Sequence, residues 1–249
     1  MVKTVERAIR ILNLISQRDL KLHEISSSLT IHKSTVSRLL ATLEKNGLIK
    51  KDKETKRFRL GLKILDLAYC LQEGLDIRNI AHPYLAELGK LTRETIHLAV
   101  LDREEIVYLD KIESSHPVRM HSRIGNRAPL YCTAVGKVIL AYLPEKELDS
   151  IIERMEFLKL TNKTIIEPNE LRKRLELLRK QGYSTDKGEY EPDIFCISAP
   201  IFDFNHDVIA SISVSVTRGR TSFNELLQFV PTLKQFAEKI SRELGYQER

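Results

Sequence analysis

Apolar residues in the first third of the chain recur at the spacing of helices with one buried face. The segment 33–46 places four of them at i, i+3, i+4 and i+7: Val36, Leu39, Leu40 and Leu43. A shorter run over 22–29 precedes it, with Thr30–His32 between the two runs. Residues 4–17 form another such segment, with Thr4 at the N-cap position and an apolar face of Val5, Ala8, Ile9, Leu12 and Ile15. The pattern predicts three helices, and a three-residue turn between the second and third is the layout of a helix-turn-helix.

The polar face of the 33–46 helix carries small hydroxyl side chains beside a long cation. Short side chains let a helix approach the major groove of DNA, and arginine can bind guanine with two hydrogen bonds. Gly47 can end the helix, and two β-like runs around 52–55 then predict a cation-rich hairpin, or wing. We expect DNA contacts from Lys33, Ser34, Thr35, Ser37 and Arg38 in the helix, and from Lys50, Lys51, Lys56 and Arg57 in the wing. An ordinary helix pair with a solvated polar face is the alternative.

A connector helix over 62–75 is predicted next, and it is more apolar than a free linker needs to be. Its apolar repeat consists of Leu62, Leu65, Ala68 or Tyr69, and Leu71 or Gln72, and Gly74 ends it. Pairing with a second copy of the chain accounts for this repeat, and packing on the following domain is the alternative. Residues 77–92 then open that domain as an amphipathic helix with a face of Ile77, Ile80, Ala81, Tyr84, Leu85, Leu88 and Leu91.

The rest of the chain alternates strand-like and helical patterns. We predict strands over 95–101, 105–112, 118–124, 183–186, 193–202 and 208–216, with 125–129 as a turn. Helices are predicted over 133–143, 145–155 and 170–181, and from the capping box at 222–225 to the end, with a kink at Pro231. The fold class is therefore α+β, with one antiparallel sheet of five or six strands flanked by helices. The predicted domains are 1–61, 62–75 as a connector, and 76–249.

Charge is divided unevenly between these domains. Residues 1–60 hold 14 lysines and arginines against 6 acidic residues, whereas the remainder holds 26 against 28. All of the net positive charge of +6 therefore comes from the first quarter of the chain. This asymmetry indicates a polyanion-binding module joined to a near-neutral domain. No apolar run approaches the ~20 residues of a membrane span, so we expect a cytoplasmic protein without a membrane partner.

Other chemistry finds little support in the sequence. Cys70, Cys132 and Cys196 lie more than sixty residues apart, which fits neither a metal knuckle nor a disulfide framework. A Cys–His hydrolase could combine Cys132 or Cys196 with His97 or His121, and a metal site could combine His116 and His121 with Asp110 or Glu113. No nucleophile signature, phosphate loop, GxGxxG or HExxH accompanies them. We predict no catalytic site, metal or cofactor; a keto-acid enzyme and a cysteine redox sensor remain alternatives.

Four motifs make the chain resemble the IclR-type bacterial transcription regulators. They are KSTVSRLLATLEKNGLI, FRLGLKILDLA, PLYCTAVGKVILAYLP and FCISAPIFDFNHDVIASISVS, and the resemblance extends from Thr4 to Tyr246. It implies a winged helix-turn-helix, a connector and a GAF-like effector domain, assembled as a dimer or dimer of dimers on a palindromic operator. Residues 92–114 and 120–137 are most similar to KdgR-type repressors, which respond to 2-keto-3-deoxygluconate. The chain departs from the pattern with Thr30 for a turn glycine, His32 for a helix-opening proline and Lys21 for a capping hydroxyl residue.

The resemblance also implies a site for a small carboxylate effector between the sheet and the helix that starts near Thr133. Backbone N–H groups in a first helical turn lack intrahelical partners and favour anions, which suits Ala134, Val135 and Gly136. The remaining pocket residues implied by the family are Met120, Asp186, Ile194, Cys196, Ser213 and Ser215. Asp186 and the serines could bind hydroxyls of a sugar acid. Judged by the residues alone, the serines could equally belong to a solvated strand face and Cys196 to the core.

Overall fold

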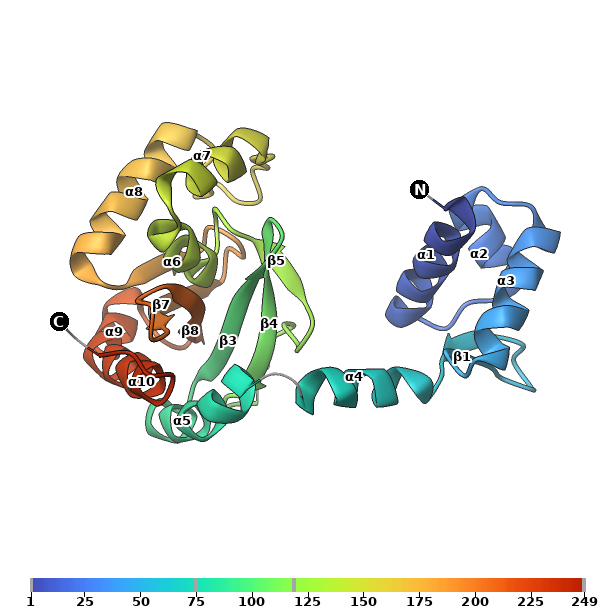
Figure 1. Cartoon of the computed structure of the whole chain (residues 1–249), viewed down its shortest axis with the longest axis horizontal. Helices are drawn as coiled ribbons and strands as arrows, with labels where there is room; N and C mark the ends of the chain where they lie inside the picture. The colour runs from blue at the N-terminus through green and yellow to red at the C-terminus, as the bar shows by residue number, and fades with distance from the viewer. Residues whose placement is uncertain (1, 74–75, 118–119, 248–249) are drawn as a thin grey trace. The chain divides into compact units, whose positions relative to one another are not determined.

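The chain divides into two compact units, residues 1–75 and 76–249. The computed structural model describes residues 2–73, 76–117 and 120–247 (Figure 1). The first unit consists of α1 (Lys3–Gln17), α2 (Leu22–Leu29), α3 (Lys33–Lys45), β1 (Ile49–Lys51), β2 (Phe58–Leu60) and α4 (Lys63–Glu73). Its helix-turn-helix and two-stranded antiparallel wing match the predicted elements closely. The predicted helix end at Gly74 lies outside the described residues.

The core of the first unit is formed by apolar residues from all three of its first helices and from the wing. Ile11, Ile25, Leu40, Ile49 and Phe58 are among its fully or nearly fully buried members. Phe58 also forms a β-bridge with Leu20, which joins the wing to the segment before α2. The wing is therefore part of the packed unit, because its inner residues share the same core.

The predicted apolar face of the first helix is partly wrong. Ile15 is buried as expected, but Val5 and Ile9 are 57% and 52% exposed, and Ile11 takes their place in the core. A core of this size covers only one side of α1, so the remaining apolar residues stay on the surface. Thr4 does not cap the helix either, since the N-cap is Val2 and makes no side-chain cap.

The second unit is built on one antiparallel sheet with strand order β5-β4-β3-β8-β7-β6. The strands are β3 (Thr95–Asp102), β4 (Glu105–Ile112), β5 (Arg127–Pro129), β6 (Ser184–Lys187), β7 (Ile194–Phe202) and β8 (Val208–Thr217). The helices are α5 (Asp76–Thr92), α6 (Ala134–Tyr142), α7 (Glu145–Arg154), α8 (Pro168–Gln181), α9 (Phe223–Leu227) and α10 (Val230–Glu243). The α+β class is confirmed.

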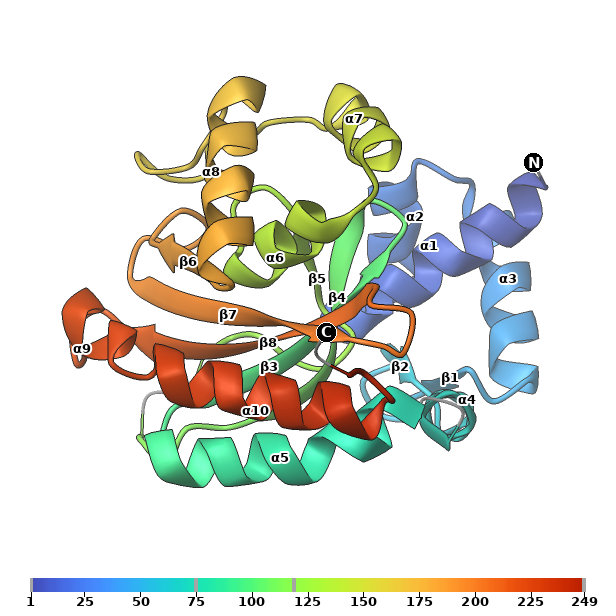
Figure 2. The same ribbon diagram turned by 60° about the vertical axis from the view of Figure 1, so that its left-hand side comes forward.

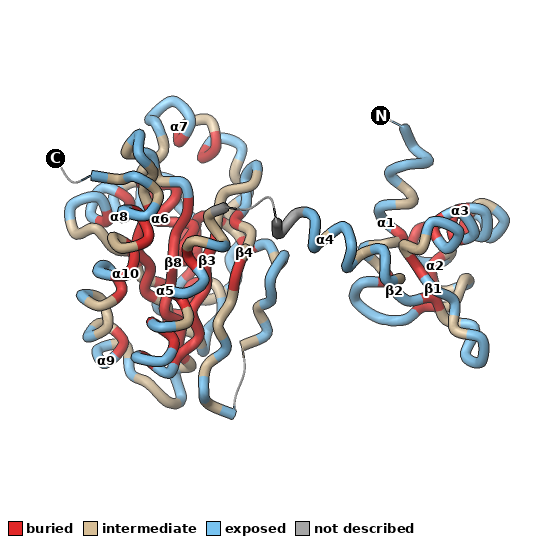
Figure 3. Tube along the Cα trace, turned by 60° about the horizontal axis from the view of Figure 1, so that its bottom comes forward, coloured by how far each residue is buried: buried red, intermediate tan, exposed pale blue. Residues whose placement is uncertain are grey.

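Helices cover both faces of this sheet (Figure 2). Helices α5 and α10 pack on one face, and their shared core includes Ile96, Ile197, Ile212 and Val214. Helix α6 packs on the other face, where α7 and α8 complete a second core. The central strands β3, β8 and β7 are buried along most of their length (Figure 3). Because strand side chains alternate between faces, residues such as Ser213 point to the α6 side.

Three predictions about the second unit are corrected by the structure: one strand, the terminal helix and the burial of one residue. The described residues 120–124 of the expected strand over 118–124 are irregular, and the strand is instead the short β5, inside the expected turn at 125–129. The terminal segment forms two helices, since Pro231 occupies the first turn of α10 instead of kinking one helix. Leu91, expected on the buried face of α5, is 61% exposed.

Candidate functional site

Helix α3 presents a polar surface opposite its buried apolar face. Val36 and Leu40 are buried, while four of the five expected contact residues are exposed: Lys33, Ser34, Ser37 and Arg38. Thr35 is half-buried. The N-cap of this helix is His32, whose Nδ1 accepts a hydrogen bond from the Ser34 backbone N–H at 3.3 Å and lies 2.7 Å from Ser34 Oγ. His32, which stands where the family often has a helix-opening proline, thus caps α3 with its side chain.

The turn before α3 depends on an unusual backbone conformation. Thr30 has φ 54° and ψ 43°, in the left-handed region where glycine is normally favoured. Its N–H donates to Ser27 O at 3.2 Å, and the Ile31 N–H donates to Ser26 O at 3.1 Å, which closes the end of α2. The helix-turn-helix geometry is therefore kept without glycine, at the cost of a β-branched residue with positive φ.

Of the four predicted wing contacts, three are exposed lysines and one is an arginine that is already paired. Lys50, Lys51 and Lys56 are exposed, and Lys51 Nζ also lies 5.4 Å from the centre of the Phe58 ring. The guanidinium of Arg57 donates to Asp19 O at 2.8 Å and lies 3.2 Å from Glu24 Oε2. Glu24 in turn accepts from the Lys21 N–H at the start of α2. The expected role of Arg57 as a phosphate contact therefore differs from its observed partners, which join the wing to α2.

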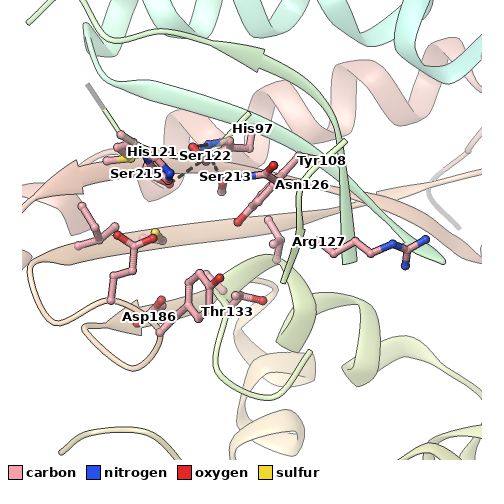
Figure 4. A pocket seen from close by; sticks show the side chains of 17 residues that line it. His97, Tyr108, His121, Ser122, Asn126, Arg127, Thr133, Asp186, Ser213 and Ser215 are labelled. Carbon is pink, nitrogen blue, oxygen red and sulfur yellow. Dashed lines mark hydrogen bonds between the residues drawn. The ribbon is translucent and has the colours of Figure 1, made fainter. Parts of the chain in front are cut away.

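A cavity of about 110 Å³ lies in the second unit between the α6 side of the sheet and the start of α6 (Figure 4). Its lining includes eight of the nine residues implied by the family resemblance: Met120, Ala134, Val135, Asp186, Ile194, Cys196, Ser213 and Ser215. This volume is far larger than a single water needs, and it suits a small organic molecule.

Gly136 is the one implied pocket residue that does not line the cavity. Its N–H donates to Thr133 Oγ1 at 3.1 Å, because Thr133 is the N-cap of α6. A Cβ at Gly136 would lie 2.5 Å from Leu130 O, so this glycine allows the preceding loop to approach the helix closely. Within the described residues, no acceptor pairs with the N–H groups of Ala134 or Val135. These two amides are the free donors of the α6 N-terminus.

Strand pairing brings the pocket side chains into one row across the sheet. His97 of β3 pairs with Ser213 of β8, Ser215 pairs with Cys196 of β7, and Cys196 pairs with Asp186 of β6. All five face α6, since the alternate residues of these strands belong to the opposite core. Residues more than a hundred positions apart thus line a single wall.

The structure adds lining residues that the sequence analysis did not assign to the pocket: His97, Tyr108, His121, Ser122, Asn126, Arg127, Thr133, Tyr190 and Glu191. His97 contacts Ser122, Ser213 and Ser215. Arg127 extends away from this cluster in Figure 4, and its guanidinium pairs with Asp102 and Glu105. Strand alternation could have placed His97 on the wall, but the partner strand of β3 was not predictable from the pattern.

A buried charged cluster lies beside the cavity. Asp186 is 3% exposed, and burial raises its pKa to about 7, although Lys137 acts in the opposite direction. The Glu189 N–H donates to Asp186 Oδ1 at 2.6 Å. Lys137 of α6 is completely buried and forms an ion pair with Glu189. This cluster joins α6 to the segment after β6, and it places a carboxyl group that titrates near neutral pH in the cavity wall.

The alternative chemistries receive no support from these surroundings. Burial raises the pKa of the Cys132 thiol to about 12, and it raises that of Cys196 further, so both thiols stay protonated and unreactive. Asp110, one of the suggested metal ligands, instead pairs with His82 at 2.6 Å. No group of three His, Cys, Asp or Glu side chains placed to hold a metal occurs among the described residues.

Residues in the described parts of the chain form no helix that is both long and apolar enough to cross a lipid bilayer. The most apolar helix of the second unit, α6, is buried because it packs on the sheet and on α8.

Comparison with known proteins finds a matching domain family for each of the two units. Residues 4–53 match the IclR helix-turn-helix domain, and residues 71–242 match the bacterial transcriptional regulator IclR C-terminal domain. The chain is 36% identical to the HTH-type transcriptional regulator XynR of Escherichia coli over 99% of this chain and 98% of the relative. It is 38% identical to the E. coli regulator KdgR over 98% of this chain and 94% of the relative.

A solved structure agrees with these sequence matches. The IclR crystal structure from Thermotoga maritima is 36% identical and superposes with a TM-score of 0.82, covering 99% of this chain and 100% of that chain. The E. coli relatives XynR, KdgR and IclR, which match over nearly the full length, are all named as transcriptional regulators or repressors. The chain therefore belongs to the IclR family, a family of transcription regulators and not of enzymes.

Proposed function

We propose that this regulator is a repressor that binds a palindromic operator as a dimer and releases it when a small carboxylate binds the cavity of the second unit. The observation that carries the proposal is the cavity at the α6 N-terminus, where the amides of Ala134 and Val135 face a wall of hydroxyl side chains. An acid that binds one dimer geometry better than another must shift the protein toward that geometry. DNA affinity then depends on the effector, and we expect the protein to act in the cytoplasm.

The DNA contacts are assigned to the exposed residues of α3 and the wing. Ser34, Thr35, Ser37 and Arg38 enter the major groove, with Lys33 at the helix start, while Lys50, Lys51 and Lys56 neutralise phosphates. If about six phosphates are neutralised per dimer, operator affinity falls roughly 10³-fold between 50 and 200 mM salt. A gel shift with the operator tests this, and salt-independent binding or full binding by Arg38→Ala would exclude the assignment.

The effector is assigned to the class of keto sugar acids, such as 2-keto-3-deoxygluconate. Its carboxylate would accept hydrogen bonds from the Ala134 and Val135 amides, where the helix dipole also favours an anion. Hydroxyl groups of its chain would bind Asp186, Ser213 and Ser215. The resemblance of residues 92–114 and 120–137 to KdgR-type repressors supports this class over short keto acids.

Thermal shift with a panel of sugar acids and keto acids tests the effector class. A ligand at 100 times its dissociation constant that binds only the folded state stabilises it by about 2.7 kcal/mol. The stabilising acid should also release operator DNA in the gel shift. Ser215→Ala should weaken both effects without changing operator affinity in the absence of acid. An acid that stabilises the protein but leaves DNA binding unchanged would argue against the repressor mechanism.

A homodimer, or a dimer of dimers, is supported by apolar residues that the first unit leaves on its surface. Val2, Val5 and Ile9 of the α1 region and Leu62 and Leu65 at the start of α4 are all more than half exposed. Apolar side chains gathered in this way mark protein–protein contact surfaces. Light scattering on the full chain should give a dimer or tetramer, and Ile9→Glu with Leu65→Glu should lower its mass.

A further inference from the structure

His97 occupies the centre of a hydrogen-bonded group in the cavity wall. It is 3% exposed and lines the cavity from β3. Its Nε2 lies 2.8 Å from Ser122 Oγ, and its Nδ1 lies 3.4 Å from both Ser213 Oγ and Ser215 Oγ. In Figure 4 this group lies on the opposite side of the pocket from Thr133, the N-cap of α6.

The imidazole is held uncharged by its surroundings. Burial, together with the nearby Lys111 ammonium, lowers the pKa of His97 to about 3. Lys111 also donates to Ser122 O at 2.6 Å and to Met120 O at 3.1 Å, and it pairs with Glu113 at 2.9 Å. Lys111 therefore positions the segment that carries Ser122 and adds to the effect of burial, which is the main cause of the neutral ring. A neutral imidazole has one donor and one acceptor nitrogen.

The tautomer of this neutral ring determines whether the hydroxyl groups of Ser213 and Ser215 can donate or accept a hydrogen bond with a ligand. If Nδ1 is the acceptor, it accepts a hydrogen bond from a serine hydroxyl; if Nδ1 carries the proton, it donates a hydrogen bond to a serine oxygen. Contacts of 3.4 Å are long for hydrogen bonds, so the serines keep capacity for a closer partner. Tyr108, whose ring centre lies 4.7 Å from that of His97, adds a phenol that burial keeps protonated by raising its pKa. The part of the wall formed by His97, Tyr108 and the serines is polar and uncharged, which suits hydroxyl groups better than a second carboxylate.

We propose that His97, with Ser122 behind it, selects ligands that carry hydroxyl groups on the carbons remote from the carboxylate. This inference rests on the proposed function, because it assumes that the carboxylate occupies the α6 end of the cavity. An unhydroxylated chain would leave the two serines with only their long, 3.4 Å contacts to the imidazole, and poorly paired buried polar groups are costly. Hydroxylated keto acids are thereby separated from plain ones of the same length.

Calorimetric titration of the full chain with two acids of equal chain length tests the proposal. The probes are 2-keto-3-deoxygluconate, which carries distal hydroxyls, and 2-ketohexanoate, which carries none. The unmodified protein should favour the hydroxylated acid by about 100-fold. His97→Phe should reduce this ratio to less than about tenfold by weakening only the hydroxylated acid. His97→Gln, which keeps a neutral donor and acceptor, should preserve a larger ratio than His97→Phe.

Two further measurements separate recognition from a structural role. Far-UV and near-UV circular dichroism spectra of both variants should match those of the unmodified protein, which shows intact folding. The imidazole ¹⁵N shifts of His97 should change on adding 2-keto-3-deoxygluconate and stay constant with 2-ketohexanoate.

Three outcomes would overturn the inference. Equal affinity of the unmodified protein for the two acids would do so while leaving the carboxylate site intact. Equal weakening of both acids by His97→Phe would assign the residue a structural role only. Failure of both acids to bind the unmodified protein would overturn the proposed effector class and this inference with it.

Discussion

Arg57 of the wing and Glu24 of α2 form an ion pair across 33 positions of sequence, with Nη1 and Oε2 3.2 Å apart. The same carboxylate accepts from the Lys21 N–H, and the same guanidinium donates to Asp19 O. Hydrogen bonding at Lys21 and the Arg57 charge lower the pKa of Glu24, with the backbone contact as the larger cause. Arg57, which the sequence predicts as a phosphate contact, thus joins the wing to the start of the helix-turn-helix.

Replacing Arg57 should therefore affect DNA binding differently from replacing a free wing lysine. We expect Lys50→Ala to reduce the slope of log affinity against log salt by about one per subunit, because one phosphate contact is lost. Arg57→Ala should leave this slope unchanged and instead lower the melting temperature of the first unit. Gel shifts over a salt series measure both slopes. An equal reduction for the two variants would show that Arg57 contacts a phosphate as well.

Thr30→Gly should stabilise the protein. A left-handed conformation costs a non-glycine residue about 1–2 kcal/mol, which glycine avoids, although glycine loses about 0.5–1 kcal/mol of chain entropy. We expect a net gain of roughly 0.5–1 kcal/mol, measured by urea denaturation. Ser28→Gly, at an exposed position inside α2, is the matched control and should destabilise by about 0.5 kcal/mol. A loss of stability in Thr30→Gly would show that the observed turn conformation carries no strain.

Gly136→Ala should destabilise the second unit. The added methyl group would lie 2.5 Å from Leu130 O and 2.7 Å from Thr133 Oγ1, so the loop before α6 must move. Overpacking of this kind costs about 1–3 kcal/mol. Gly219→Ala is the control, because its Cβ would meet no atom within 4 Å and its stability should stay within about 0.5 kcal/mol. Thermal denaturation of both variants checks the difference, and equal melting temperatures would contradict the close packing at Gly136.

Asp186 should make stability depend on pH in the neutral range. Its folded-state pKa of about 7 lies above the usual 3.8, so the folded protein binds the proton more tightly than the unfolded chain. The penalty for ionising the buried carboxyl is absent below pH about 4, grows as pH rises, and is complete above about 7. Asp186→Asn should remove this dependence and stabilise the protein at pH 8 by on the order of 2–4 kcal/mol.

Urea denaturation at pH 5 and pH 8 tests this prediction. The stability gain of Asp186→Asn should be clearly larger at pH 8 than at pH 5. Asp203→Asn serves as the control, because this carboxyl is only half-buried and lies in the loop between β7 and β8. A gain that is equal at both pH values would show that the carboxyl is already ionised at pH 5.

The local elements of this fold are largely encoded in short stretches of sequence. The period of apolar residues located α2, α3 and β4, and the capping box at Ser222 located the start of α9. These signals depend on neighbours within a few residues, so they can be recognised without knowing the tertiary fold. Where the expectation failed, a distant contact decided instead: Ile11 displaced Val5 and Ile9 because only one side of α1 meets the core.

The basic character of the first sixty residues and the family resemblance follow from the sequence itself, since charge and motif depend on composition and order alone. The pairing of Arg57 with Glu24, the neutral state of His97 and the row from His97 to Asp186 were decided only by tertiary structure. Each requires groups that are far apart along the chain to lie within a few ångströms, and burial to change their electrostatics. Strand order and side-chain packing set those distances, and the periodicity of a single segment does not contain them.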